Sequence, residues 1–241
     1  MPDRIFSNAV VEQFAGSEGR DLISQVVRAY PGRVALLSSF GAESSVLLHM
    51  ISEVTPDLPI IFLDTHKLFP ETISYRDQLV RELGLTGLRI VSPDSADLAR
   101  VDPSNDLSGR DTDLCCHIRK TVPLAKATER FDVMISGRKR FHGAARSDLQ
   151  FVSEQDGKLK VEPLAAFSAF DLSNYMQKHH LPSHPLKLLG YHSIGCMPCT
   201  AVGGSVEDPR AGRWKGTEKT ECGIHFSANG TVVRTVPRAS A

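Results

Sequence analysis

The sequence predicts an α/β protein built on a doubly wound, mostly parallel sheet. Short apolar runs of strand length alternate along the chain with longer segments whose apolar residues recur at helical spacing. The short runs are apolar along their whole length, as strands are when helices cover both faces of a sheet. Turn residues such as glycine and proline separate the segments, which is typical of alternating strand–helix units.

The predicted elements of the first half follow from these patterns in order. Residues 8–30 are expected to be helical with an interruption at 16–19, and residues 33–40 and 59–65 are buried strands. Residues 41–54 and 69–83 are helices, the second beginning at Pro70. Residues 88–91 and 131–137 are further strands. Between them, residues 111–131 form a helical region with a kink or break at Pro123.

The pattern changes from about residue 149. A hairpin is expected to turn at Asp156 and Gly157, followed by a helix over 169–181 capped by Ser168 or Asp171. After residue 200 the chain is rich in Gly, Lys, Arg and Thr and has little apolar periodicity, so a mobile tail is expected. With 241 residues and 41% hydrophobic residues, the chain is predicted to form one domain over 1–205 and a tail over 206–241.

Composition narrows the classes of function. Lys plus Arg and Asp plus Glu each number 28, so overall charge does not favour nucleic-acid or membrane binding. No apolar run has the length of a membrane span, and the N-terminus lacks a secretion-signal pattern. We therefore expect a cytoplasmic protein. Five cysteines without such a signal indicate metal or catalytic thiols rather than disulfides.

A glycine loop after the first strand is the first candidate site. Small residues allow the backbone to approach an anion, and amides at a helix start donate to it. The alternative is an ordinary strand-to-helix turn, and no Gly-Lys-Ser/Thr follows to make a Walker A loop. The candidate residues of this loop are Ser38, Ser39, Gly41, Ala42 and Glu43.

Two more strand ends carry polar or basic residues. Leu63, Asp64 and Thr65 end the second strand, while Gly137 and Arg138 end the fourth and begin a basic run that precedes Arg146. A basic run is usually a solvated face. At the carboxyl edge of a parallel sheet, however, a bound phosphate or sulfate explains it better, so we predict a nucleotide-like anion site there.

Four thiols form the second candidate site. Cys196 and Cys199 have the Cys-x-x-Cys spacing of a metal half-site, whereas Cys115 and Cys116 are adjacent. Neighbouring side chains on a helix diverge by about 100°, which suits the separate iron corners of a [4Fe–4S] cluster better than one zinc ion. Buried inert cysteines are the alternative. Lys120 lies one helical turn beyond Cys116 and would offset the charge of such a cluster, unless it is simply solvated.

The fifth cysteine stands alone near the C-terminus. Glu221 disfavours a thiolate at Cys222, whereas Lys215, Lys219 and protonated His225 favour it. A position on a tail would allow the thiol to move between a substrate and a reductant. We expect Cys222 to be a nucleophile rather than a harmless exposed thiol.

Taken together, SSFGAES, LDTHKLFPET, the CC pair, the CxxC pair and ECGIH resemble the motifs of the assimilatory adenylyl-sulfate (APS) reductases. These iron–sulfur enzymes belong to the phosphoadenylyl-sulfate (PAPS) reductase family. The resemblance covers residues 30–226, with the motifs in the family's order. It implies an adenine-nucleotide alpha-hydrolase (PP-loop) fold. One departure is His66, which stands where the family's second-strand motif usually has glycine.

The resemblance also implies roles for individual residues. Cys222 matches the catalytic nucleophile, with His225 a candidate for support. The substrate-binding set would be Ser38, Ser39, Gly41, Ala42, Glu43, Leu63, Asp64, Thr65, Lys120, Gly137, Arg138, Arg146, Arg210 and Arg213. The ligands of one [4Fe–4S] cluster per chain would be Cys115, Cys116, Cys196 and Cys199.

The implied reaction is reduction of adenylyl sulfate to sulfite and AMP through a Cys222 S-sulfonate, with thioredoxin or a similar dithiol as reductant. The pathway would be assimilatory sulfate reduction and cysteine biosynthesis. Use of PAPS, alone or beside APS, is the nearest alternative, and a homo-oligomer is left open. An iron–sulfur PP-loop tRNA thiolase and a nucleotide-binding redox sensor are more distant alternatives.

Overall fold

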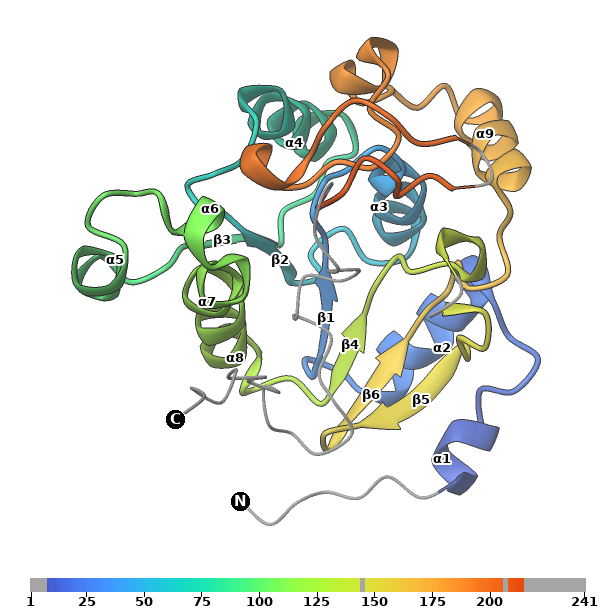
Figure 1. Ribbon diagram of the computed structural model, residues 1–241. Coiled ribbons are helices and arrows are strands. Elements are labelled where there is room, and N and C mark those ends of the chain that lie inside the picture. The colour runs from blue at the N-terminus through green and yellow to red at the C-terminus, as the bar shows by residue number, and fades with distance from the viewer. Residues whose placement is uncertain (1–7, 144–145, 206–207, 215–241) are drawn as a thin grey trace.

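A six-stranded sheet forms the centre of the protein, and its strands are ordered β3-β2-β1-β4-β6-β5 (Figure 1). The computed structural model describes residues 8–143, 146–205 and 208–214. Every neighbouring pair of strands is parallel except β5 and β6, so the predicted doubly wound, mostly parallel sheet is confirmed. The strands are β1 Val34–Leu37, β2 Ile60–Leu63, β3 Leu88–Val91, β4 Val133–Ile135, β5 Val152–Gln155 and β6 Lys158–Val161.

Helices connect the strands and cover both faces of the sheet. The helices in the described ranges are α1 Asn8–Glu12, α2 Gly19–Ala29, α3 Ser44–Val54, α4 Pro70–Glu82, α5 Ser95–Val101, α6 Leu107–Arg110, α7 Thr112–Cys116, α8 Val122–Thr128 and α9 Ala169–Lys178. Short 3₁₀ turns span Arg140–His142, Pro185–Leu189 and Met197–Cys199. None of the helices in these ranges is both long and apolar enough to cross a membrane.

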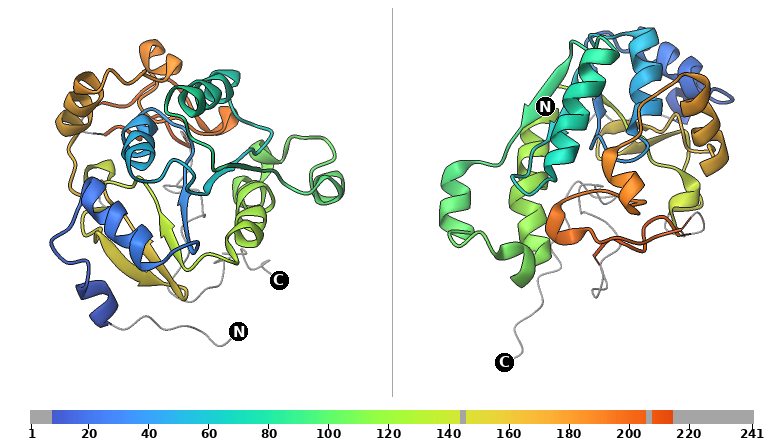
Figure 2. Two further views of the ribbon diagram at one scale, coloured as in Figure 1. Left: turned by 180° about the vertical axis from the view of Figure 1, so that it is seen from behind. Right: turned by 90° about the horizontal axis from the view of Figure 1, so that it is seen from above.

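The alternation of side chains along β1 separates the two layers of the core. Val34 and Leu36 belong to the larger apolar cluster, which α2, α3 and α4 cover. Ala35 lies on the opposite face, with Phe131 and with Leu124 of α8. The further views show α7 and α8 on one side of the sheet and α2 and α3 on the other (Figure 2).

The helix that carries the cysteine pair differs from the expectation at Pro123. No break occurs there: α7 continues through a π-helical turn, His117–Thr121, directly into α8. Pro123 stands in the first turn of α8 and has no amide hydrogen to donate to the turn before it, which is the π-helical one. The helix therefore continues through Pro123, with a wider turn just before it.

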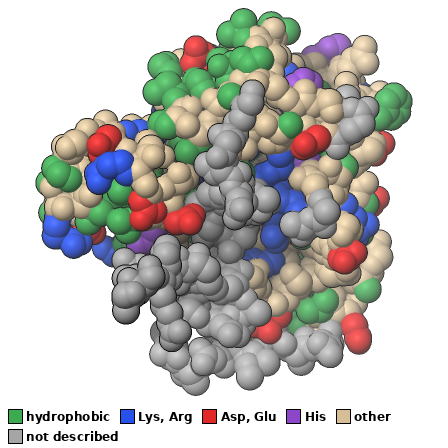
Figure 3. Space-filling model, in the orientation of Figure 1, with side chains coloured by type: hydrophobic (Ala, Val, Ile, Leu, Met, Phe, Trp, Pro, Cys, Tyr) green, Lys and Arg blue, Asp and Glu red, His purple; other side chains and the backbone are tan. Residues whose placement is uncertain are grey.

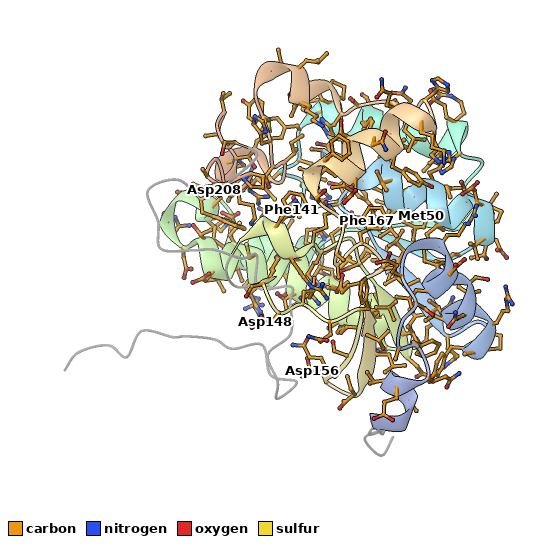
Figure 4. The ribbon with its side chains drawn as sticks, turned by 90° about the vertical axis from the view of Figure 1, so that its right-hand side faces the viewer. Met50, Phe141, Asp148, Asp156, Phe167 and Asp208 are labelled. Carbon is orange, nitrogen blue, oxygen red and sulfur yellow. The ribbon has the colours of Figure 1, made fainter. Side chains whose placement is uncertain are left out.

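In the second half of the chain, the hairpin turns and α9 begins at the residues that the sequence predicts. Asp156 and Gly157 have φ of 58° and 68°, so both are left-handed and close the β5–β6 hairpin as a two-residue primed turn. Asp156 lies at one end of the sheet, away from Phe141 (Figure 4). Ser168 and Asp171 form a reciprocal capping box at the start of α9, so both predicted caps are used.

Candidate active site

A cavity of about 250 Å³ lies at the carboxyl ends of the parallel strands. Loops that follow β1, β2 and β4 supply three of its walls, and the segment 192–196 supplies another. Parallel strands end together at one edge of a sheet, which is why residues far apart in the sequence meet there. On the face shown in Figure 3, Lys and Arg side chains gather near the centre.

The cavity contains almost all of the residues predicted to bind a nucleotide-like anion. Its lining includes Ser38, Ser39, Gly41, Ala42, Glu43, Leu63, Thr65, Lys120, Gly137, Arg138, Arg146, Arg210 and Arg213. Asp64 is not in the lining, and its carboxylate instead accepts a hydrogen bond of 3.0 Å from the backbone of His66. His66 has φ of 56°, a left-handed conformation that glycine adopts without strain. This geometry explains why glycine suits that position in related motifs.

A hydrogen bond to the Ser38 hydroxyl shapes the loop after β1. Ser38 accepts a hydrogen bond of 3.2 Å from the backbone N–H of Phe40, which has φ of 49°. This turn places Gly41, Ala42 and Ser44 in the cavity wall, with Ser44 at the first position of α3. The amides at the start of an eleven-residue helix thus lie beside the cavity, and they favour an anion there.

Glu43 is a carboxylate inside an otherwise cationic site, and two neighbours account for it. Lys139 Nζ lies 2.6 Å and His142 Nε2 3.0 Å from its Oε2. Burial alone would raise the pKa of Glu43, but His142 and Lys139 outweigh it and lower the pKa to about 2. Burial lowers the pKa of His142. The charge of Glu43 therefore holds the loop after β4 against the loop after β1.

The three cations of the basic run after β4 do not all face the cavity. Arg138 and Lys139 line the cavity, whereas Arg140 donates to Leu149 O at 2.9 Å and lies over the Phe151 ring. Arg146, further along the loop, is buried and also lines the cavity. Sequence alone does not separate these roles, because a run of three cations gives no side-chain direction.

The four paired cysteines come together in the fold, next to the cavity. Cys115, Cys116 and Cys196 are buried, and Cys199 is half-buried. Burial raises the pKa of Cys115, Arg119 lowers it, and the nearby Cys196 and Cys199 thiols raise it further. Cys196 also lines the cavity, so the group of thiols adjoins the cavity wall.

Hydrogen bonds join the segment after β2 to the Cys-x-x-Cys turn. Thr65 Oγ1 lies 3.2 Å from Cys196 Sγ, and Met197 donates to Lys67 O at 2.7 Å. Behind them, Arg119 is buried, pairs with Asp102 at 2.6 Å and donates to Thr65 O at 3.0 Å. This network was not predicted. Arg119 is one residue from Lys120, but nothing in the sequence marks Asp102 as its partner.

The segment 208–214 carries two of the predicted arginines. Arg213 donates to Cys199 O at 3.2 Å and lies over the ring of Trp214, which Arg210 also contacts. The backbone of Trp214 donates to the same carbonyl at 3.1 Å. The Cys-x-x-Cys turn therefore positions both arginines, which line the cavity.

Several cavity residues were not predicted from the sequence. They are Leu47, Phe62, Leu68, Thr72, His142 and the segment 192–195. His142 belongs to the loop after β4 that carries predicted residues, so its place in that loop is a signal that would have found it. Segment 192–195 gives no comparable signal. Cys222 and His225 lie outside the described residues, as do residues 206–207 and 215–241 of the predicted tail.

The chemistry of the four thiols fits an iron–sulfur cluster, because they come from two separate segments and suit separate iron corners. Across residues 8–143, 146–205 and 208–214, no group of three His, Cys, Asp or Glu side chains that could hold a metal ion is found. Arg119 Nε and His117 Nδ1 are buried near the cysteine pair without hydrogen-bond partners in the described structure. Sulfur acceptors at that place would satisfy such groups.

Comparison with known proteins gives consistent matches. A phosphoadenosine phosphosulfate reductase domain matches residues 33–202. Adenosine 5′-phosphosulfate reductase of Mesorhizobium japonicum is 47% identical over 80% of this chain and 76% of its own length. Phosphoadenosine 5′-phosphosulfate reductase of Gloeobacter violaceus is 35% identical over 85% and 87%. The fold resembles phosphoadenylyl-sulfate reductase from Candida auris, with a TM-score of 0.69 at 21% identity, covering 80% of this chain and 97% of that one.

Proposed function

The chain belongs to the phosphoadenosine phosphosulfate reductase family, and we propose that it reduces adenylyl sulfate to sulfite and AMP. The observation that carries this proposal is that the group of thiols adjoins the wall of the cationic cavity. A cavity at the carboxyl edge of a parallel sheet suits a nucleotide, and its arginines suit the phosphosulfate group. The relatives named for this activity support the choice of substrate.

Substrate binding would divide the cavity between two parts of the ligand. The adenosine would lie along the ends of β1 and β2, against Ala42, Leu63 and Thr65. The phosphosulfate would be held by the cations Lys120, Arg146, Arg210 and Arg213, which come from three separate segments. Four cations placed in advance around a developing negative charge stabilise the departure of AMP.

The nucleophile of the proposed reaction is the thiolate of Cys222. It attacks the sulfur of the sulfate group, the bond from that sulfur to the bridging oxygen breaks, and AMP leaves with the electron pair. A thiolate of the reductant then attacks Cys222 Sγ. The bond between Cys222 Sγ and the sulfonate sulfur breaks, and sulfite leaves with the electron pair of that bond. The second thiol of the reductant resolves the mixed disulfide. The two electrons thus come from a dithiol, for which we propose thioredoxin, working in the reducing cytoplasm.

A [4Fe–4S] cluster is the proposed resident cofactor, held by Cys115, Cys116, Cys196 and Cys199. When bound, it would supply electrostatic and structural support beside the sulfate end of the cavity. The residues of this chain do the rest: Lys120 and Arg213 orient the substrate, and Thr65 and Arg119 fix the segments that carry the thiols.

PAPS is the second candidate substrate, alone or beside adenylyl sulfate. The relative from Gloeobacter violaceus carries that name at 35% identity, against 47% for the Mesorhizobium japonicum protein named for adenosine 5′-phosphosulfate. Identity therefore favours the substrate without the 3′-phosphate.

The testing experiment measures sulfite release with thioredoxin from adenylyl sulfate and from PAPS, on protein purified without oxygen. We expect sulfite from adenylyl sulfate and about four irons per chain. Cys222→Ser should abolish sulfite release and leave the iron content unchanged. Equal rates on both substrates would replace the first candidate with a dual reductase. No sulfite from either substrate, with a full iron content, would overturn the proposal.

A further inference from the structure

Glu162 is a buried carboxylate at the edge of the cavity that no motif singles out. It follows the last residue of β6 and is 1% exposed. Parallel pairing of β4 with β6 sets Ile135 opposite Val161, so Glu162 lies beside Ser136 at the carboxyl edge of the sheet. Its backbone N–H donates to Phe151 O at 2.8 Å, which fixes it to the strand. A charge buried at this position needs a specific reason, because desolvation is costly.

The carboxylate is fully occupied by the loop after β4. Its Oε2 accepts from the Ser136 hydroxyl at 2.6 Å and from the Arg138 backbone at 3.2 Å. Its Oε1 accepts from Arg138 Nε at 2.7 Å and pairs with Nη2 at 2.5 Å. One side chain therefore fixes both the backbone and the guanidinium of Arg138. A buried ion pair of this kind fixes orientation more than it adds stability.

The pairing leaves one edge of Arg138 for the cavity. Nε and Nη2 are used by Glu162, while Nη1 has no hydrogen-bond partner in the structure as far as it is described. Arg138 lines the cavity, and its side chain is 19% exposed. Lys139 differs, since its only nitrogen donor group is bound by Glu43 and its side chain is 5% exposed. Of these two neighbouring cations, Arg138 is the one presented to a ligand.

From this geometry we infer that Glu162 is a positioning residue for substrate binding: it holds Arg138 so that Nη1 meets a polar or anionic group of adenylyl sulfate. This inference rests on the proposed function and deepens it. Glu162 itself does not touch the substrate. Its effect should therefore pass entirely through Arg138, and this requirement makes the inference testable.

The test is a double-mutant cycle with Glu162→Gln, Arg138→Ala and the double variant. AMP affinity by calorimetry and KM and kcat for adenylyl sulfate are measured on the cluster-loaded full chain. Each single change should weaken AMP binding and raise KM about tenfold, as loss of one charge-assisted hydrogen bond does, with little change in kcat. The double variant should also lose about tenfold, because the second change removes nothing further. Glu162→Asp, which keeps the charge, should restore part of the affinity.

Glu53→Gln is the matched control, because it removes one carboxylate near the far end of α3, where Glu53 pairs with Arg20. It should leave AMP affinity and KM unchanged. A double variant that loses about a hundredfold would show independent effects and overturn the inference, as would a loss confined to kcat. If Glu162→Gln does not fold, Glu162→Asp takes its place in the cycle. Wild-type protein that binds neither nucleotide would instead overturn the proposed function itself.

Discussion

At the scale of single residues, the site depends on close approaches as much as on charges. Gly195 lies directly beneath the guanidinium of Arg213, and a Cβ added there would stand 2.4 Å from its Nη2. Such a distance is far inside van der Waals contact, so Arg213 would have to move. A side chain at this position would displace the end of Arg213, whereas the backbone angle of Gly195 sets no such limit.

Gly195→Ala should therefore weaken substrate binding without unfolding the protein. Displacement of one charge-assisted contact is expected to raise KM for adenylyl sulfate about tenfold. Gly109→Ala is the control, because a Cβ there meets nothing within 4 Å. Steady-state kinetics of both variants would check this. An unchanged KM in Gly195→Ala would contradict the assignment of Arg213 to the substrate.

His184 makes a second residue-scale prediction, which concerns pH. It is fully buried, accepts from the backbone of Leu186 at 3.2 Å and lies 3.1 Å from Thr72 Oγ1 in the cavity wall. Burial lowers the pKa of His184 to about 4, and Glu71 opposes this only in part. The folded state thus favours the neutral ring. Its contribution to stability is complete above the unfolded pKa of about 6.5 and is lost as pH falls toward 4.

Acidification from pH 7 to pH 4 should thus cost up to about 3 kcal/mol through His184. His184→Asn keeps an acceptor for Leu186 but cannot take up a proton. The difference in unfolding free energy between wild type and this variant should shrink as pH falls. Urea unfolding across the range measures it, with the exposed His180→Asn as control. A difference that stays constant with pH would refute the titration.

At the scale of elements, local chemistry fixes where helices begin. The Ser168 hydroxyl accepts from the Asp171 backbone at 3.2 Å, and Asp171 Oδ2 accepts from the Ser168 backbone at 2.8 Å. This reciprocal cap satisfies amides that α9 itself leaves unpaired.

Loss of the cap has a predictable cost. Ser168→Ala should lower the free energy of unfolding by about 1 kcal/mol. Ser173→Ala, a change of the same size at an exposed position inside α9, should be neutral or slightly stabilising. Thermal or urea unfolding of the two variants gives the comparison. Equal effects would mean that the capping box contributes nothing.

The helix that carries the cysteine pair shows what an element pattern misses. The sequence predicts a helical region over residues 111–131, and α7 and α8 lie within it. The π-helical turn His117–Thr121 is not predicted, because it depends on how the chain satisfies its backbone ahead of Pro123. That turn matters for the site because it contains Arg119, which donates to Thr65 O, and Lys120, which lines the cavity.

At the scale of the whole molecule, the four thiols lie on two segments that are distant in sequence. Cys115 and Cys116 belong to the helix on one face of the sheet, and Cys196 and Cys199 to the turn beside the loop after β2. A cluster bound by all four would hold these segments together, so its binding would contribute to folding stability.

Each of Cys115→Ser, Cys116→Ser, Cys196→Ser and Cys199→Ser should therefore lose iron and melt several degrees below wild type. Cys222→Ser provides the matched control, and it should keep both iron and melting temperature. Iron analysis and calorimetry under argon measure the two quantities. Full iron content in any of the four variants would exclude that residue as a ligand.

The sequence by itself predicted the alternation of strands and helices, the hairpin turn, the α9 cap and most of the residues that line the cavity. The elements, the turn and the cap depend on short-range patterns such as apolar periodicity and positive-φ turn residues. The cavity residues were instead predicted from the meeting of parallel strand ends and from the family resemblance. Only the tertiary structure decided how the charges are divided, with Glu43 bound to Lys139 and Glu162 bound to Arg138. The physical reason is that ion pairing depends on distances of a few ångströms between residues far apart in the chain, and no local pattern encodes those distances.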